Sequence, residues 1–135
     1  MKKTTVYLDM DGTIADLYNE ENWLADLIAE KVDPFVNAKP MTTEKVLLEL
    51  FPTDRYEIKI LSMTPKHATK EYCNRVADAK SEWLDRYFPS LTKRIYRAYG
   101  NNKNLRNSAN AILVDDNAEI RQTFRGIAVN PADLW

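Results

Sequence analysis

Five short apolar segments recur along the chain, and each is followed by a stretch with the polar and apolar spacing of a helix. β-Branched and aromatic residues dominate the first segment and the fourth is wholly apolar, so both are expected to be buried strands. This alternation predicts an α/β fold with a central, mainly parallel five-stranded sheet flanked by helices. The expected strands are residues 4–9, 56–61, 94–97, 111–114 and 126–129.

Apolar positions three and four residues apart predict helices between these strands. Thr64 and Pro65 have the pattern of a helix start, with threonine as the N-cap and proline in the first helical position. Pro89 then ends that helix, and the asparagine-rich residues 100–104 are expected to form a turn. The expected helices are residues 19–30, 43–50, 65–88 in one or two pieces, and 118–124.

Residues 15–55 form the longest interval between consecutive expected strands. The interval carries two short amphipathic segments and a loop at Pro34 and Pro40. A simple crossover needs fewer residues, so we expect a small helical cap inserted over the edge of the sheet. Residues 1–135 as a whole are expected to form a single domain, because this length suits one ordinary hydrophobic core.

The chain is close to neutral, with 19 Lys and Arg against 20 Asp and Glu and a formal net charge of −1. It therefore lacks a global positive field that could hold a nucleic-acid polymer or an anionic membrane. No apolar stretch approaches the roughly 18 residues of a membrane span, and Asp9 and Asp11 interrupt the apolar run that a signal peptide needs. We expect a cytoplasmic, globular protein whose oligomeric state stays open.

Carboxylates are the reactive groups that the sequence places most unevenly. A single cysteine and a single histidine largely exclude disulfides, Cys/His zinc sites and histidine-based triads. Asp9 and Asp11 follow the first strand in the segment DMDGT, and alternation along a strand predicts that both project to the same side. Asp115 and Asp116 follow the fourth strand. If the two strands are neighbours, up to four carboxylates meet at one edge, where Mg²⁺ would offset their repulsion.

Groups that could bind a phosphate lie near the same expected edge. Gly12 allows a sharp turn and leaves backbone N–H groups open to an anion. Ser62 and Thr64 supply hydroxyls at the end of the second strand, and Ser62 is favoured because it directly follows the apolar run. Lys80 is in phase with the apolar stripe of its helix, which predicts that it points inward. Lys103, in the asparagine-rich turn, is a weaker second candidate.

Taken together, these motifs resemble the haloacid dehalogenase superfamily. DMDGT, a hydroxyl after the second strand, an inward lysine and DD after a later strand occur in the order of the four signature motifs of that superfamily. ILS at residues 60–62, KSEWL at 80–84, KNL at 103–105 and ILVDDN at 112–117, together with Asp16 after DMDGTIA, look most like the 5′(3′)-deoxyribonucleotidase-like group. The resemblance implies a Rossmann-like fold with a cap and a Mg²⁺-dependent phosphomonoesterase of (deoxy)nucleoside monophosphates.

The resemblance also implies a role for each residue. Asp9 would attack phosphorus and become an aspartyl phosphate, and Asp11 would act as general acid and later as general base. The Mg²⁺ ligands would be Asp9, the backbone carbonyl of Asp11, and Asp115 or Asp116. The phosphate-binding candidates are Ser62, Thr64, Lys80 and Lys103. A cap of this length is expected to cover a phosphate site rather than enclose a whole nucleotide.

Several alternatives stay open at this point. The enzyme could act on another small phosphate ester, or the chain could bind phosphate without turnover. A receiver-type regulatory module has similar residues but places its acidic pair after the first strand, whereas DD lies near the end here. A calcium loop is disfavoured because Ile14 stands where that loop needs glycine. The basic and aromatic residues 93–99 could contact a nucleic acid or protect an edge strand.

Overall fold

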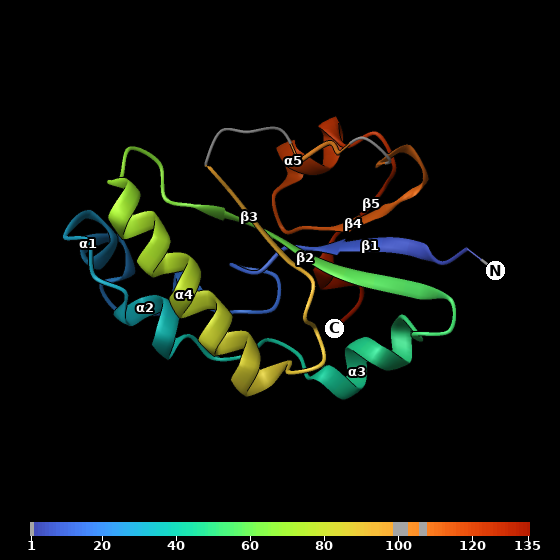
Figure 1. Ribbon diagram of the computed structural model, residues 1–135, viewed down its shortest axis with the longest axis horizontal. Helices are drawn as coiled ribbons and strands as arrows, with labels where there is room; N and C mark the ends of the chain where they lie inside the picture. The colour runs from blue at the N-terminus through green and yellow to red at the C-terminus, as the bar shows by residue number, and fades with distance from the viewer. Residues whose placement is uncertain (1, 99–102, 106–107) are drawn as a thin grey trace.

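Five parallel strands form one sheet at the centre of the molecule (Figure 1). The computed structural model describes residues 2–98, 103–105 and 108–135. The strand order is β3-β2-β1-β4-β5, and all four strand pairs are parallel. The α/β class and all five expected strands are confirmed. The strands are β1 (Thr4–Leu8), β2 (Tyr56–Thr64), β3 (Arg94–Ala98), β4 (Ile112–Val114) and β5 (Ile127–Val129).

Helices connect the strands and cover the sheet on both sides. Threonine or asparagine caps three of them, because the side chains of Thr43, Thr69 and Asn117 each accept a hydrogen bond from the N–H three residues on. The α-helices are α1 (Trp23–Ile28), α2 (Asp33–Asn37), α3 (Glu44–Leu50), α4 (Lys70–Tyr87) and α5 (Ala118–Thr123). Short 3₁₀ turns lie at Leu17–Asn19, Ser108–Asn110 and Pro131–Asp133.

Two local predictions were wrong. Thr64 does not cap a helix: it is the last residue of β2 and pairs with Ala98 of β3. Helix α4 begins only after Thr69, whose hydroxyl accepts the N–H of Tyr72 at 3.1 Å. The expected loop at Pro34 also contains helix α2, in which Pro34 is the second residue. Proline is tolerated there because the first-turn N–H groups of a helix have no partner within it.

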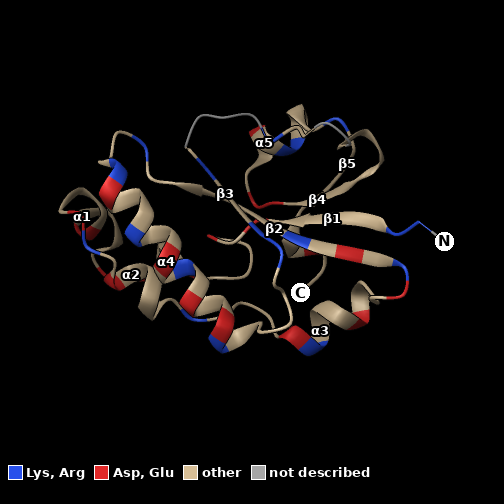
Figure 2. Ribbon diagram, in the orientation of Figure 1, with Lys and Arg blue, Asp and Glu red and all other residues tan. Residues whose placement is uncertain are grey.

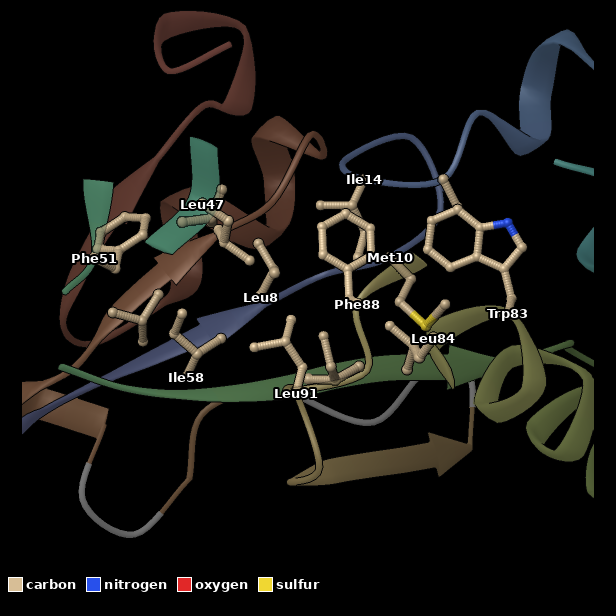
Figure 3. Close-up of a cluster of buried hydrophobic side chains, with 14 of the residues drawn as sticks. Leu8, Met10, Ile14, Leu47, Phe51, Ile58, Trp83, Leu84, Phe88 and Leu91 are labelled. Carbon is tan, nitrogen blue, oxygen red and sulfur yellow. The ribbon is translucent and has the colours of Figure 1, made fainter. Parts of the chain in front are cut away.

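The apolar core is divided by the sheet, since alternate side chains of each strand point to opposite faces. Leu8, Ile58 and Ile60 belong to the larger cluster, which also contains residues of α3 and α4 (Figure 3). Tyr7 and Leu61 belong to a smaller cluster on the other face. Labelled members of the larger cluster in Figure 3 are Leu8, Met10, Ile14, Leu47, Phe51, Ile58, Trp83, Leu84, Phe88 and Leu91.

The long interval between β1 and β2 has two parts with different surroundings. Helices α1 and α2 lie beside α4 at the end of the molecule toward which β1 runs, whereas α3 lies at the other end (Figure 1). Phe35 of α2 packs with Tyr72, Val76 and Ala79 of α4 in a third apolar cluster. Leu47 of α3 instead belongs to the larger core cluster. Only residues 17–37 therefore stand over the carboxyl ends of the strands; we call this segment the cap.

Two basic residues at the sheet edge, Lys93 and Arg94, are paired within the chain. Arg94 forms an ion pair with Asp85 at 2.8 Å, and Lys93 forms one with Glu57 at 3.0 Å. β3 is an edge strand, and such pairing is typical of edges protected by charge. Tyr99, the last residue of the basic and aromatic segment, lies outside the described residues. Figure 2 shows positive and negative residues interspersed along α4.

In the part of the chain that the structure describes, no helix combines the length and apolar character needed to cross a membrane.

Candidate active site

Two acidic residues meet where the central strands end. β1 pairs with β4, with Leu8 opposite Val114, so the residues that follow, Asp9 and Asp115, lie side by side. The Asp9 N–H donates to the Val114 carbonyl at 3.0 Å and extends this pairing by one residue. One oxygen from each of Asp9, Asp115 and Asp116 lies within 4.8 Å of the others. The expected neighbourhood of the first and fourth strands is confirmed, and this acidic cluster could hold a metal ion.

Lys103 joins the two buried members of the acidic cluster. Its Nζ donates to Asp9 Oδ1 at 2.8 Å and to Asp115 Oδ2 at 2.7 Å. Burial opposes a charge on Lys103, but the two carboxylates outweigh burial and raise its pKa above the ordinary value. Lys103 is therefore a charged group at the base of the site. The asparagine-rich turn expected around it falls mainly on residues 100–102, which lie outside the described residues.

The acidic cluster is still short of positive charge. Burial, followed by the charge of Asp9, raises the pKa of Asp115 even though Lys103 opposes the change. Asp116 is an exposed residue, but loss of solvent at its carboxyl, hydrogen bonding with Asp9 and repulsion from Asp9 and Asp115 raise its pKa to about 7. Such raised values mean that the ionised cluster is unfavourable without a further cation. An all-oxygen donor set of this charge fits a hard divalent ion.

Gly12 is needed for a close approach. Its φ of +79° lies in the region that favours glycine, and a Cβ at this position would collide with the Asp116 carboxylate. The Gly12 N–H itself is not open to an anion, whereas the N–H groups of Met10 and Asp11 in the same turn donate to no described residue. The Gly12 N–H donates to the Ala15 carbonyl at 2.8 Å, and the N–H groups of residues 13–15 all donate to Met10. Because Gly12 has no side chain, the backbone of the turn can pack directly against the Asp116 carboxylate.

Thr13 is a site residue that the sequence did not reveal. Its buried hydroxyl lies 3.0 Å from Asp9 Oδ2 and 3.3 Å from Asp116 Oδ1, and it accepts the Asp116 N–H at 3.2 Å. The hydroxyl has one proton and can donate to only one of the two carboxylates at a time. The Trp135 indole N–H donates a hydrogen bond to the Thr13 carbonyl at 3.0 Å. The place of Thr13 at the end of the DMDGT segment is the sequence signal for this role.

Asp11 takes a different place from the one that strand alternation predicts. β1 ends at Leu8, so Asp11 belongs to the turn, and its carboxylate is not part of the cluster of Asp9, Asp115 and Asp116. Its Oδ2 instead accepts a hydrogen bond from Lys80 Nζ at 2.9 Å. Three carboxylates meet, not four, and the fourth lines the same cavity from one side.

Lys80 points inward, as its helical phase predicts, and only 1% of its surface is exposed. Its Nζ donates to Ser62 Oγ at 2.7 Å and to the Met63 carbonyl at 2.9 Å, in addition to Asp11. Neither Lys80 nor Ser62 lines the cavity, whereas Thr64 and Lys103 do. The structure therefore separates the four phosphate-binding candidates into two that face the cavity and two that lie behind Asp11.

A cavity of about 350 Å³ lies over these groups. Its floor is polar, and the first part of the expected insertion, residues 15–55, contributes an apolar wall. Tyr18 and Trp23 stand edge to face with ring centroids 5.0 Å apart. Partial burial and the nearby charges of Asp11 and Asp116 raise the pKa of Tyr18. The wall residues from the cap are Leu17, Tyr18, Trp23, Leu27 and Phe35.

Neither the protein-family models nor the curated proteins with which the chain was compared match it.

Proposed function

We propose that the protein is a Mg²⁺-dependent phosphomonoesterase that works through an aspartyl phosphate on Asp9. The observation that carries this proposal is the meeting of Asp9, Asp115, Asp116 and Lys103 on the floor of a cavity that Asp11 also lines. A nucleophile, cationic partners and a second carboxylate within one cavity are the components that phosphate transfer to a carboxylate requires. The resemblance to the haloacid dehalogenase superfamily supports the same reaction.

Each residue has a place in the proposed reaction. An Asp9 carboxylate oxygen forms a bond to phosphorus while the bond from phosphorus to the ester oxygen breaks, and Asp11 donates a proton to the departing alcohol. Asp11 then removes a proton from the water that attacks the aspartyl phosphate and frees Asp9. Lys103 lies beside Asp9 and would hold an oxygen of the phosphate.

The acidic cluster gives the proposed cation its ligands. Asp9, Asp115 and Asp116 would supply carboxylate oxygens, and the main-chain carbonyl of Asp11 accepts no hydrogen bond from the described residues. When bound, Mg²⁺ would neutralise charge on both the attacking carboxylate and the phosphate. Among the described residues, Lys80 and Lys103 are the ammonium groups that form ion pairs with any of the four carboxylates, which leaves a formal excess of negative charge that a divalent ion would offset.

The cap wall supports a substrate that carries a flat or apolar group next to its phosphate. A volume of about 350 Å³ is at the small end of the usual range for ligand pockets. The aromatic rings of Tyr18 and Trp23 could contact a planar group at the rim. We therefore place (deoxy)nucleoside monophosphates first among the candidate substrates, and other small phosphate esters second.

Phosphate release tests the proposal directly. The unmutated protein is incubated with nucleoside monophosphates and sugar phosphates, with and without Mg²⁺, and inorganic phosphate is measured. Asp9→Asn, which keeps the side-chain shape, is the matched control. We expect release that requires Mg²⁺ and is lost in Asp9→Asn. No release from any substrate by the unmutated protein would contradict the enzymatic function, and activity retained in Asp9→Asn would remove Asp9 as the nucleophile.

A further inference from the structure

Lys80 and Asp115 are the most completely enclosed charged side chains of the site, each with 1% of its surface exposed. Lys80 stands in the middle of α4 and reaches the turn after β1 and the end of β2 with a single ammonium group. An ammonium group has three N–H donors. Each has an acceptor within 2.9 Å: Asp11 Oδ2, Ser62 Oγ and the Met63 carbonyl. With 1% of its surface exposed, Lys80 has neither a donor nor a path to offer to a phosphate in the cavity.

Asp11 is held on one side only. Its Oδ2 is bound to Lys80, whereas Oδ1 accepts no hydrogen bond from the described residues. The Asp11 side chain keeps 18% of its surface exposed and lines the cavity. One carboxyl oxygen is thus anchored in the protein interior, and the other is left for a group that enters the cavity.

We propose that Lys80, with Ser62 behind it, is a positioning residue that orients the Asp11 carboxyl group for proton transfer and does not itself bind the phosphate. This inference rests on the proposed function and assigns Lys80 a task different from that of Lys103. Lys103 contacts Asp9 and lines the cavity. The two lysines therefore serve the two carboxylates of the DMDGT turn separately, one for attack on phosphorus and one for the leaving group.

The proton transfer shows what Lys80 contributes. When the bond between phosphorus and the ester oxygen breaks, the proton of Asp11 passes to that oxygen, and Asp11 is left as a carboxylate. The Lys80 ammonium group, 2.9 Å from Oδ2, already lies beside the oxygen that shares this new charge. When water attacks the aspartyl phosphate, its proton passes back to Asp11. The ammonium group holds the same three hydrogen bonds throughout, so the carboxyl group keeps its orientation in both steps.

Two aryl phosphates separate positioning of the acid from binding of phosphate. 4-Nitrophenol leaves readily without a proton, whereas phenol depends on one, so a defect at Asp11 affects phenyl phosphate more. We expect Lys80→Met to lower kcat/KM about 100-fold for phenyl phosphate but less than about threefold for 4-nitrophenyl phosphate. The inhibition constant of inorganic phosphate should change less than about twofold. Lys45→Met, at an exposed position of α3, is the matched control and should leave all three values unchanged.

Equal losses with the two esters, or weaker inhibition by inorganic phosphate, would overturn the inference and return Lys80 to phosphate binding. A second loss when Lys80→Met is added to Asp11→Asn would also contradict it, because residues that act through one group are not additive. If Lys80→Met does not fold, Ser62→Ala carries the same test: a larger loss on phenyl phosphate supports the inference, and equal losses or none overturn it. Absence of hydrolysis by the unmutated protein would instead remove the proposed function itself.

Discussion

Substitution of Asp116 by asparagine should stabilise the metal-free protein at neutral and higher pH. In the folded protein the pKa of this carboxyl rises from 3.8 to about 7. The folded state therefore binds more protons than the unfolded state between these values, and the free energy of unfolding falls as pH rises from about 4 to about 7. Asp116→Asn cannot ionise and escapes this loss, while its amide oxygen can still accept a hydrogen bond from Thr13.

The size of the effect follows from the same two values. A rise from 3.8 to about 7 corresponds to at most ~4 kcal/mol, at 1.36 kcal/mol for each pKa unit. Asp116 is exposed, so solvent screens much of the repulsion, and we expect ~1–2 kcal/mol. For a domain of this size that is a rise in Tm of roughly 3 to 8 °C at pH 8.

Thermal unfolding in a chelator, at intervals from pH 4 to pH 8, measures this difference. The Tm of Asp116→Asn should equal that of the unmutated protein near pH 4 and exceed it at pH 8. Mg²⁺ should raise the Tm of the unmutated protein most at high pH, because the proton and the cation compete for one carboxylate. Asp54→Asn, at an exposed turn outside the site, is the matched control and should show no such difference. A metal-free Asp116→Asn that is less stable than the unmutated protein at pH 8 would refute the charge-crowding argument.

Substitutions at three further positions test other contacts of the site and cap. Gly12→Ala should destabilise the protein by ~2 kcal/mol or more, because it combines a positive φ with a collision at Asp116. Thermal unfolding measures this effect, and an unchanged Tm would contradict the close approach. Lys103→Met should lower the free energy of unfolding by ~3 kcal/mol in a buffer with chelator, because it leaves buried carboxylates unpaired, and by less in a buffer with Mg²⁺. Equal unfolding curves of the variant in the two buffers would refute this. Glu30→Ala should lower the free energy of unfolding, measured in urea, by ~1 kcal/mol, because the Glu30 carboxylate accepts hydrogen bonds from both the N–H and the hydroxyl of Thr69. Glu30→Gln keeps an acceptor oxygen and should recover part of this loss.

Strands and helix phases could be read from the sequence because they depend on neighbouring residues. The apolar run before Asp9 identifies β1, and the spacing of apolar residues in α4 identifies Lys80 as an inward residue. The start of α4 could not be placed because Thr64 and Thr69 both offer a hydroxyl that could cap it. Only the pairing of Thr64 with β3 decides between them.

For a different reason, the burial of Lys103 could not be predicted. Lys103 lies in a polar segment without periodicity, and its buried ammonium group is bound by Asp9, which lies 94 residues away in the chain. A contact between residues so far apart in the chain produces no pattern in the residues next to Lys103. Thr13 is similar, because its hydroxyl serves Asp116 across 103 residues. Sequence motifs thus brought Asp9, Asp115 and Asp116 together but misplaced Asp11, and they could not place Lys103 or the Thr13 hydroxyl.

The charged groups of the cavity and its aromatic wall come from separate parts of the chain. The carboxylates and Lys103 come from segments outside residues 17–37, whereas the aromatic wall comes from within this segment. A described contact between the two is that of the Phe35 ring with Lys80, 5.4 Å from the ring centroid to Nζ. Substitutions at wall residues other than Tyr18, whose ring lies near Gly12 and feels the charges of Asp11 and Asp116, and Phe35, which contacts Lys80, can therefore change the wall with little effect on the reactive groups. Under the proposed function, the substrate preference can change while the reaction is retained, and a library confined to residues 17–37 is the natural starting point for testing this.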